Sequence, residues 1–229
     1  MSARSPWVPR VLLGIGALAL IAAVVSIAVG DDGPDAPATE GFNETQSLLG
    51  GITQEGAVLG SPDAPVLVKV FNDVRCQPCA DYQVAEIDPV IERYVRDDEV
   101  QFEFSHFSLG PEPTSLAAVA ATAAGEQGRQ WQYIDLLVRN LEAARGDTDE
   151  DFLVDVARAV PELELEQWQE DRADPETLRT VEDDAADAAE LELSADPAVI
   201  VTGPGGEERL EGAPTSEEIE AAVEASLRS

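Results

Sequence analysis

Two cysteines, Cys76 and Cys79, are the residues of this chain best suited to chemistry, and they lie three positions apart. A strongly apolar run at 66–71 precedes them, and apolar residues at helical spacing follow, so the Cys-x-x-Cys segment is predicted to open a helix. Unpaired backbone N–H groups at a helix start stabilise a thiolate, which is the attacking species in disulfide exchange. The spacing therefore predicts a redox pair, with Cys76 as the exposed nucleophile and Cys79, one turn deeper, as the resolving cysteine.

The residues around the two cysteines are expected to tune this chemistry. Arg75 would add positive potential beside the first sulfur, and Gln77 and Pro78, between the cysteines, would set the redox potential. Pro78 suits the first turn of a helix because no N–H is needed there. No organic cofactor or metal is required, since the two sulfurs carry the electrons.

Three other interpretations of the cysteine pair stay open. The first is a permanent structural disulfide, although the loop that it would close is too small to stabilise the fold much. The second is a zinc or copper site, although a four-ligand cysteine and histidine site cannot be built in one chain that has two cysteines and a single histidine, His106. The third is an inert buried pair.

Acidic residues dominate the charge of the chain. Asp and Glu number 46 against 14 Lys and Arg, which gives a net charge of −32. Such a surface repels nucleic acid and anionic lipid headgroups, so nucleic acid is not expected as a partner. Hydrophobic residues make up 44% of the chain, which argues for a globular core and against wholesale disorder.

The start of the chain predicts a membrane anchor. Residues 11–30 form an uncharged apolar run, long enough as a helix to cross about 30 Å of hydrocarbon. Arg4 and Arg10 precede this run, and Asp31 and Asp32 follow it, so the N-terminus is predicted to be cytoplasmic and the remainder extracytoplasmic. The alternative is a cleaved signal peptide, which would give a secreted protein. Both interpretations place the cysteines where disulfides persist.

The remainder is predicted to be a tether followed by one domain. Residues 31–60 are rich in Gly, Pro, Asp, Thr and Glu and are expected to form an acidic flexible linker, with a short ordered piece around residues 47–49. Residues 61–229 suffice for a single domain. Helical patterns at about 112–191 separate its early strands from its late ones, which predicts an inserted helical subdomain.

The order of elements in this domain indicates an α/β fold. Strands at 66–71 and 100–104 with a helix between them predict a parallel pair joined by a right-handed crossover. After the helical block, a strand at 198–201 and a hairpin partner at 207–210 are expected to add antiparallel strands.

The sequence also predicts four local features. Pro89 should kink or divide the helix that follows the cysteines. Residues 114 to about 145 are expected to be helical, first in an alanine-rich part and then at 131–141 with an apolar face. Ser216 is predicted to cap the last helix, and Asp88 to be solvated.

The segment Phe71-x-Asp73-x-x-Cys76-x-x-Cys79, with a strand before it and a helix after it, resembles the opening of the DsbA-like branch of the thioredoxin superfamily, in its membrane-anchored, extracytoplasmic form. The resemblance extends over about residues 60–229. It implies a thioredoxin fold, in which a central mixed sheet is flanked by helices and carries a helical insertion. It also implies a cis-proline before a late strand and against the cysteine pair, and Asp196-Pro197 matches that position.

The same resemblance points to further site residues. Asp196 and Pro197 would hold an extended substrate peptide by backbone hydrogen bonds beside the reactive sulfur. Asp73 and His106 are candidate accessory residues. Asp73 matches the family motif but also suits a turn, and His106, expected after the second strand, is either a proton relay or a surface residue.

Two departures from the family pattern leave the direction of electron flow open. The family usually has an apolar residue or threonine before the proline, and the carboxylate of Asp196 is expected to raise the pKa of Cys76 and make the pair less oxidising. Gln77-Pro78 also differs from the Pro-His dipeptide of the strongest oxidase and from the Gly-Pro of thioredoxin-like reductases.

The predicted function is thiol–disulfide exchange on exported proteins, in the direction of disulfide oxidation, with a membrane redox partner that resets the pair. One alternative is an extracytoplasmic reductase or isomerase of the same fold. The other is a binding or chaperone-like module whose cysteines only form a structural disulfide.

Overall fold

The computed structural model describes residues 40–110, 115–145 and 148–228. The chain divides into two compact units, 1–38 and 39–229, and the described residues belong to the second. The predicted membrane anchor at 11–30 lies outside the described residues. Among the residues that are described, no helix is long and apolar enough to cross a bilayer.

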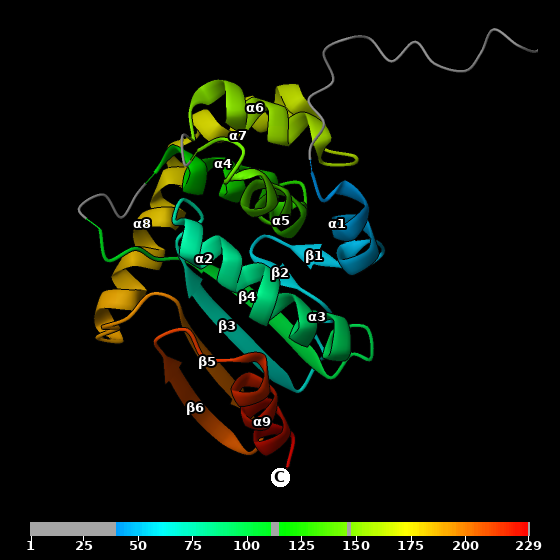
Figure 1. Cartoon of the computed structure of the whole chain (residues 1–229), viewed down its shortest axis with the longest axis vertical. Helices are drawn as coiled ribbons and strands as arrows, with labels where there is room; N and C mark the ends of the chain where they lie inside the picture. Colours follow the sequence, from blue (N-terminus) through cyan, green and yellow to red (C-terminus); the bar gives the residue numbers. More distant parts are fainter. Residues whose placement is uncertain (1–39, 111–114, 146–147, 229) are drawn as a thin grey trace, which may run out of the picture. The chain divides into compact units, whose positions relative to one another are not determined.

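A mixed sheet forms the centre of the described domain (Figure 1), and its six described strands have the order β1-β2-β4-β3-β5-β6. β3 and β4 are parallel, and β5 pairs antiparallel with β3 on its other side. The short strands β1 and β2 extend the β4 side, and β6 pairs with β5 at the opposite edge. The strand bounds are β1 Gln54–Glu55, β2 Val58–Leu59, β3 Val66–Asn72, β4 Val100–His106, β5 Ala198–Gly203 and β6 Gly206–Glu211.

Both faces of β3, an inner strand of the sheet, are covered. Val68 and Val70 are fully buried in the main core, whereas Phe71 belongs to a second, smaller apolar cluster on the other face. This explains the nearly continuous apolar sequence of the strand. Lys69 is the exception, and its ammonium reaches Glu103 at 3.0 Å and Asp187 at 3.2 Å while its stem covers apolar surface.

One helical run carries the chain from the cysteines to β4. It comprises α2 Gln77–Tyr82, a π-helical turn at Gln83–Ile87 and α3 Asp88–Tyr94. Pro89 lies in the first turn of α3, directly after the π-turn. Proline lacks the N–H that an uninterrupted α-helix needs, so the wider turn lies where the sequence predicted a division.

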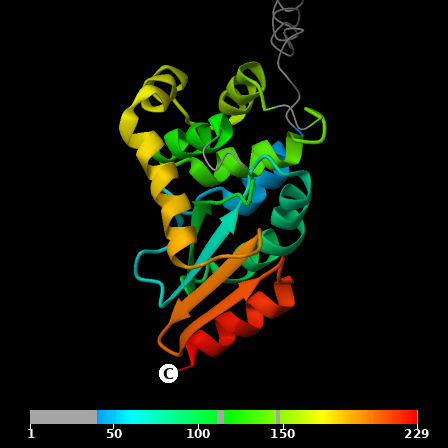
Figure 2. The ribbon, with the colours of Figure 1, turned by 90° about the vertical axis from the view of Figure 1, so that its left-hand side faces the viewer.

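The helical block lies between β4 and β5, and Figure 2 shows its last helix, α8, returning along the sheet. The helical stretch expected from 114 to about 145 is divided into two helices, because the chain turns at Gly128 with a φ of +65°. The helices of the block are α4 Leu116–Gly125, α5 Gln130–Asn140, α6 Glu150–Ala159, α7 Leu165–Ala173 and α8 Pro175–Glu190.

The last helix, α9 Ser216–Leu227, packs on β5, with Ile219 and Val223 fully buried. The prediction that Ser216 caps this helix is wrong by one residue. The N-cap is Thr215, which accepts from the backbone of Glu218 while Glu218 reaches back to Thr215. This reciprocal capping box satisfies two helix-start donors, which Ser216 inside the helix does not do.

The flexible linker predicted for 31–60 differs from the structure in its second half. α1 Phe42–Leu49 and the strands β1 and β2 occupy this stretch. The reason is burial, since Leu49 is fully buried and the Thr45 hydroxyl lies 2.5 Å from the Asp135 carboxylate on α5. These contacts order a segment whose polar composition alone suggested a tether.

Candidate active site

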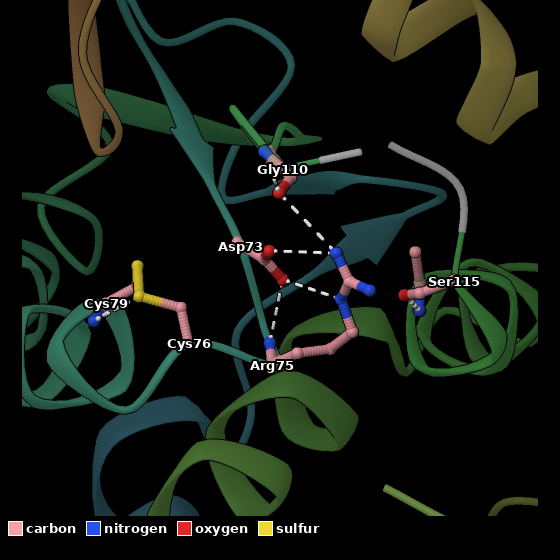
Figure 3. A network of polar contacts seen from close by, with 8 residues as sticks. Asp73, Arg75, Cys76, Cys79, Gly110 and Ser115 are labelled. Atoms are coloured by element: carbon pink, nitrogen blue, oxygen red, sulfur yellow. Dashed lines mark hydrogen bonds and ion pairs between the residues drawn. A yellow bond between two sulfur atoms is a disulfide. The ribbon is translucent and has the colours of Figure 1, made fainter. Parts of the chain in front are cut away.

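The cysteine pair lies where β3 ends and α2 begins. Cys76 and Cys79 form a disulfide with an S–S distance of 2.04 Å and a Cα–Cα distance of 5.1 Å. A turn leads from β3 to this point, and within it the Cys76 N–H donates to the Asp73 carbonyl at 3.3 Å. Cys76 is the N-cap residue of α2, so its sulfur lies beside the unpaired N–H groups of the first helical turn (Figure 3).

The two sulfurs differ in exposure and in hydrogen bonding. Cys79 is 3% exposed, whereas Cys76 is half-buried. The backbone N–H of Cys79 donates to the Cys76 sulfur at 3.3 Å. A hydrogen bond to the charged form of a group favours that form, so reduction of the disulfide leaves the N–H of Cys79 in place to stabilise a Cys76 thiolate.

Asn72 ties the strand to the helix start, and the sequence analysis did not identify it. This last residue of β3 is 1% exposed, and its side-chain amide donates to the Cys79 carbonyl at 3.2 Å. An amide at the end of a largely apolar strand could have indicated a hydrogen bond at this position, since buried polar groups are normally hydrogen-bonded.

Asp73 and Arg75 form an ion pair beside the disulfide. The Asp73 carboxylate accepts from the Arg75 backbone N–H at 2.9 Å and from its guanidinium at 3.1 and 3.0 Å. Burial alone would raise the pKa of Asp73, but these hydrogen bonds and the charge of Arg75 hold it below its usual value. Figure 3 shows the guanidinium on the side of Asp73 away from the disulfide, toward Ser115. Its charge is therefore directed first at Asp73 and only secondarily at Cys76.

Gln77 and Pro78 occupy the first two positions of α2. The Gln77 amide donates to the Asp81 carboxylate at 2.8 Å on the exposed side of the helix, and Pro78 is exposed. Both residues line the solvent side of the disulfide rather than its buried side.

Asp196 lies across from Asp73. The β3–β5 ladder ends at the pair of Phe71 and Ala198, and Asp73 and Asp196 each lie two residues beyond that pair. The peptide bond between Asp196 and Pro197 is cis. One oxygen of the Asp196 carboxyl group, Oδ1, is buried without a partner. Burial, together with the charge of Asp73, raises the pKa of Asp196 to about 7, although the Asp73 backbone and Arg75 oppose the rise.

His106 is buried, which excludes the surface position, one of the alternatives that the sequence analysis left open. It ends β4 and pairs in register with Asn72, and its side chain is 2% exposed, because the strand runs two residues further than expected. Neither ring nitrogen has a hydrogen-bond partner. Burial lowers the pKa of His106 to about 4, against the opposing charge of Asp73, so the ring is neutral at pH 7.

Asp184 is a second residue that the sequence analysis missed. From α8 it accepts from the Ser105 hydroxyl and from the His106 backbone N–H, both at 2.8 Å. Burial raises its pKa to about 6, although these bonds oppose the rise. Among the described residues, no group of three or more His, Cys, Asp or Glu side chains is placed to hold a metal ion.

The fold and the position of the cysteines agree with a comparison against known families. The family model described as Thioredoxin matches residues 53–225. The chain belongs to the thioredoxin family. The match begins at β1 and reaches into α9, so it includes the redox pair, the helical block and the segment of Asp196.

The individual relatives of this thioredoxin-family chain include proteins named for disulfide bond formation and for oxidoreductase activity. The probable disulfide bond formation protein D of Bacillus cereus is 28% identical over 152 residues, which cover 63% of this chain and 69% of that protein. A thioredoxin-like oxidoreductase from Silicibacter pomeroyi is 26% identical with a TM-score of 0.59, over 75% of this chain and 92% of its own. The oxidised BdbD of Bacillus subtilis has a TM-score of 0.62 at 20% identity, over 78% of this chain and 98% of its own, and supports the fold.

Proposed function

We propose that this protein is a thiol–disulfide oxidoreductase that forms disulfides in exported proteins, with Cys76 as the exchanging sulfur and Cys79 as the resolving one. The observation that carries the proposal is the disulfide at the start of α2, where Cys76 is half-buried, Cys79 is 3% exposed and the Cys79 N–H contacts the Cys76 sulfur. The similarity to proteins named for disulfide bond formation supports the oxidising direction.

The exposures of the two sulfurs define the order of steps. A substrate thiolate attacks the Cys76 sulfur, because that sulfur is the accessible one; the Cys76–Cys79 bond breaks and Cys79 leaves. The product is a mixed disulfide between Cys76 and the substrate. A second substrate thiolate then attacks the substrate sulfur of this bond, and Cys76 leaves as a thiolate. The substrate loses two electrons and gains a disulfide, and the two sulfurs of the pair hold the electrons, so no other cofactor takes part.

We further propose that Asp196 and Pro197 contact the substrate polypeptide. The ladder between β3 and β5 supports this assignment, because it brings these residues opposite the turn that leads into Cys76. Arg75, Gln77 and Pro78 would tune the potential of the pair. Asp73 would act through its ion pair with Arg75.

The site of action is proposed to be the extracytoplasmic face of a membrane. The apolar run at 11–30, with Arg4 and Arg10 before it, supports a single N-terminal anchor with the redox domain outside. An anchored oxidase needs a partner that withdraws two electrons after each turnover, and a redox partner within the same membrane fits that need.

Trapping of the mixed disulfide tests the proposal. The full chain in detergent, mixed with a reduced, unfolded secreted protein, should oxidise it stoichiometrically. Cys79→Ser cannot form the disulfide of the pair, so it is mixed instead with the disulfide-bonded form of the same secreted protein, whose disulfide is the oxidant. Its Cys76 thiolate should attack that disulfide and accumulate a mixed disulfide, because no second thiol of the variant resolves it, and Cys76→Ser should form none. Full function of Cys76→Ser would contradict the proposal and favour a module with a structural disulfide.

Equilibration with glutathione tests whether the protein oxidises or reduces its substrates. A reduction potential near about −120 mV, as in a strong oxidase, supports disulfide formation, whereas one near about −270 mV, as in thioredoxin, indicates a reductase. The second result would leave the exchange chemistry intact and reverse the proposed direction.

A further inference from the structure

The carboxyl groups of Asp73 and Asp196 lie near the end of β3, and they differ in whether they have a counter-charge. Asp73 is paired with Arg75 at 3.0 Å, and its side chain is 12% exposed. Asp196 lies on the approach to β5, and its Oδ1 is buried without a partner. Burial without a partner costs a charged carboxylate more than a neutral carboxyl, so the surroundings favour a proton on Asp196.

The carboxyl of Asp196 also lies close enough to the sulfurs to sense their charge. The β3–β5 ladder ends two residues away, at the pair of Phe71 and Ala198, and the charge of Asp73 acts on the Asp196 carboxyl. The turn from Asp73 to Cys76 spans less than about 7 Å, so Asp196 lies near the start of the turn that leads to the first sulfur, at a half-buried position where charges are poorly screened.

The other charged groups to consider near Asp196 are Asp73, Arg75 and Glu211. Asp73 and Arg75 are the charged groups that act on it, with opposite signs. Glu211, which faces Ala198 from β6, is held by the Ser194 backbone N–H at 2.8 Å and by Arg209 at 2.6 Å. Asp73 is bound to a guanidinium and stays ionised. Asp196 is thus the member of the pair that is able to gain and lose a proton.

We propose that Asp196 is the proton-carrying group of the redox site: its carboxyl takes up a proton when the Cys76–Cys79 disulfide is reduced and releases it when the disulfide forms again. The inference rests on the proposed function and deepens it. It assigns to Asp196 a role as a positioning residue that acts on the sulfurs through charge, in addition to any contact with substrate.

The step balances in atoms and charge. A substrate dithiol gives two electrons and two protons. Its two sulfurs become a disulfide, Cys79 becomes a thiol with one proton, Cys76 becomes a thiolate, and the Asp196 carboxylate becomes a carboxylic acid with the other proton. The negative charge that leaves Asp196 appears on Cys76, so the site does not accumulate a second charge. By linkage, the thiolate raises the proton affinity of Asp196, and a protonated Asp196 favours the thiolate by the same factor.

Proton release on reduction tests this assignment directly. The oxidised full chain is mixed with one equivalent of reduced dithiothreitol in weakly buffered solution at about pH 7.5, where Asp196 of the oxidised protein is mostly ionised, and an indicator dye reports protons. Reduction of the native chain should release few protons. Asp196→Asn, which keeps the shape of the side chain and one of its oxygens, should release up to about one proton more per disulfide reduced. Asp183→Asn, an exposed change of equal charge on α8, should behave like the native chain.

The possible outcomes separate this inference from the proposed function. Equal proton release from the native chain and Asp196→Asn, with both fully reduced, would overturn the inference and leave the exchange chemistry standing. Failure of dithiothreitol to reduce either protein would contradict the proposed function itself.

A pH profile of Cys76 alkylation in the reduced proteins gives an independent check, and Asp196→Ser is the second variant should Asp196→Asn fold poorly. The native chain and the variant should react equally at low pH, where Asp196 is protonated. The native chain should become several-fold slower once the pH exceeds the pKa of Asp196 in the reduced protein, which the thiolate raises above the value of about 7 in the oxidised protein. A constant ratio of rates at every pH is what a purely structural role predicts, and it would overturn the inference.

Discussion

Asn72 and Cys79 are joined by a hydrogen bond of 3.2 Å from the side-chain amide of the strand residue to the carbonyl of the resolving cysteine. Through this bond the end of β3 fixes the first turn of α2, and with it the N–H group that contacts the Cys76 sulfur. The position of the more reactive sulfur therefore depends on a residue that never touches it.

Replacement of Asn72 by leucine should loosen this turn. The Cys79 carbonyl would lose its side-chain donor at a buried position, which costs about 1–3 kcal/mol of unfolding free energy. Thiolate stabilisation at Cys76 should also weaken, so the pH midpoint of its alkylation should rise. Denaturant unfolding and the alkylation profile measure the two effects. Asn43→Leu, at an exposed position of α1, is the matched control and should change neither.

The ion pair between Asp73 and Arg75 should appear in the acid stability of the oxidised protein. The pKa of Asp73 is held below its ordinary 3.8, so the pair stabilises the fold above that pH, and this stabilisation is lost as the pH falls through the lower folded-state pKa. Arg75→Gln should reduce the unfolding free energy at pH 7 by about 1 kcal/mol and should flatten the loss below about pH 4.

Arg179→Gln provides the control for this prediction. Its guanidinium makes two exposed contacts on its own helix, 3.9 Å from Glu176 and 3.3 Å from the Pro175 carbonyl, so its effect should stay within about 0.5 kcal/mol. An acid unfolding curve of Arg75→Gln that runs parallel to the native curve would show that Asp73 does not depend on Arg75.

His106 should behave as a neutral, buried imidazole. Its pKa is about 4 in the folded chain against an ordinary value of 6.5, so on acidification the unfolded chain takes up a proton before the folded chain does. Stability should therefore decline as the pH falls from about 6.5 to about 4, by up to about 1.4 kcal/mol per pH unit.

His106→Leu should remove this part of the decline. The variant should also be at least as stable as the native chain at pH 5, because both ring nitrogens lack partners and their loss leaves nothing unpaired. As the chain has a single histidine, NMR can follow its titration without ambiguity. A midpoint near 6.5 in the folded protein would contradict the burial argument.

The sequence predicted those features that depend on local pattern. The apolar run of β3, the cysteines at a helix start and the division near Pro89 follow from residues within one or two turns of one another. The missed features depend on partners distant in sequence. Asp184 meets the His106 backbone across 78 positions, and Arg139 meets Asp88 across 51. A single sequence does not indicate which carboxylate will find which cation, so Asp88 was expected to be solvated although it is 8% exposed.

A buried triad of Asp88, Asp135 and Arg139 fastens α1 and α5 to the helical run that carries the cysteines. Arg139 donates to Asp135 at 2.8 Å and to Asp88 at 2.5 Å, and Thr45 of α1 contacts the same Asp135. Burial, together with the charge of Asp135, raises the pKa of Asp88 to about 8, although Arg139 opposes the rise. Asp88 is therefore mostly neutral in the folded chain below that pH, and Arg139 donates to both carboxyl groups.

Loss of the Arg139 cation should lower the unfolding free energy strongly, and a second substitution should restore part of it. Arg139→Met should lower the unfolding free energy by about 3–5 kcal/mol at pH 8, since it leaves buried carboxyls without a counter-charge. Adding Asp88→Asn should recover part of that loss, because one of the two acids is then neutral. Arg158→Met, at an exposed surface pair, should cost less than about 1 kcal/mol.

The pH dependence of Asp88→Asn stability shows whether Asp88 is protonated in the folded chain. The folded chain keeps the Asp88 proton between about pH 4 and pH 8, whereas the unfolded chain releases it near pH 4, so native stability falls with rising pH across this window. Asp88→Asn lacks this fall and should gain stability relative to the native chain as the pH rises from 5 to 8. Denaturant midpoints across that range provide the measurement. A gain in the opposite direction would mean that Asp88 is ionised at neutral pH and that the triad is held by charge pairing alone.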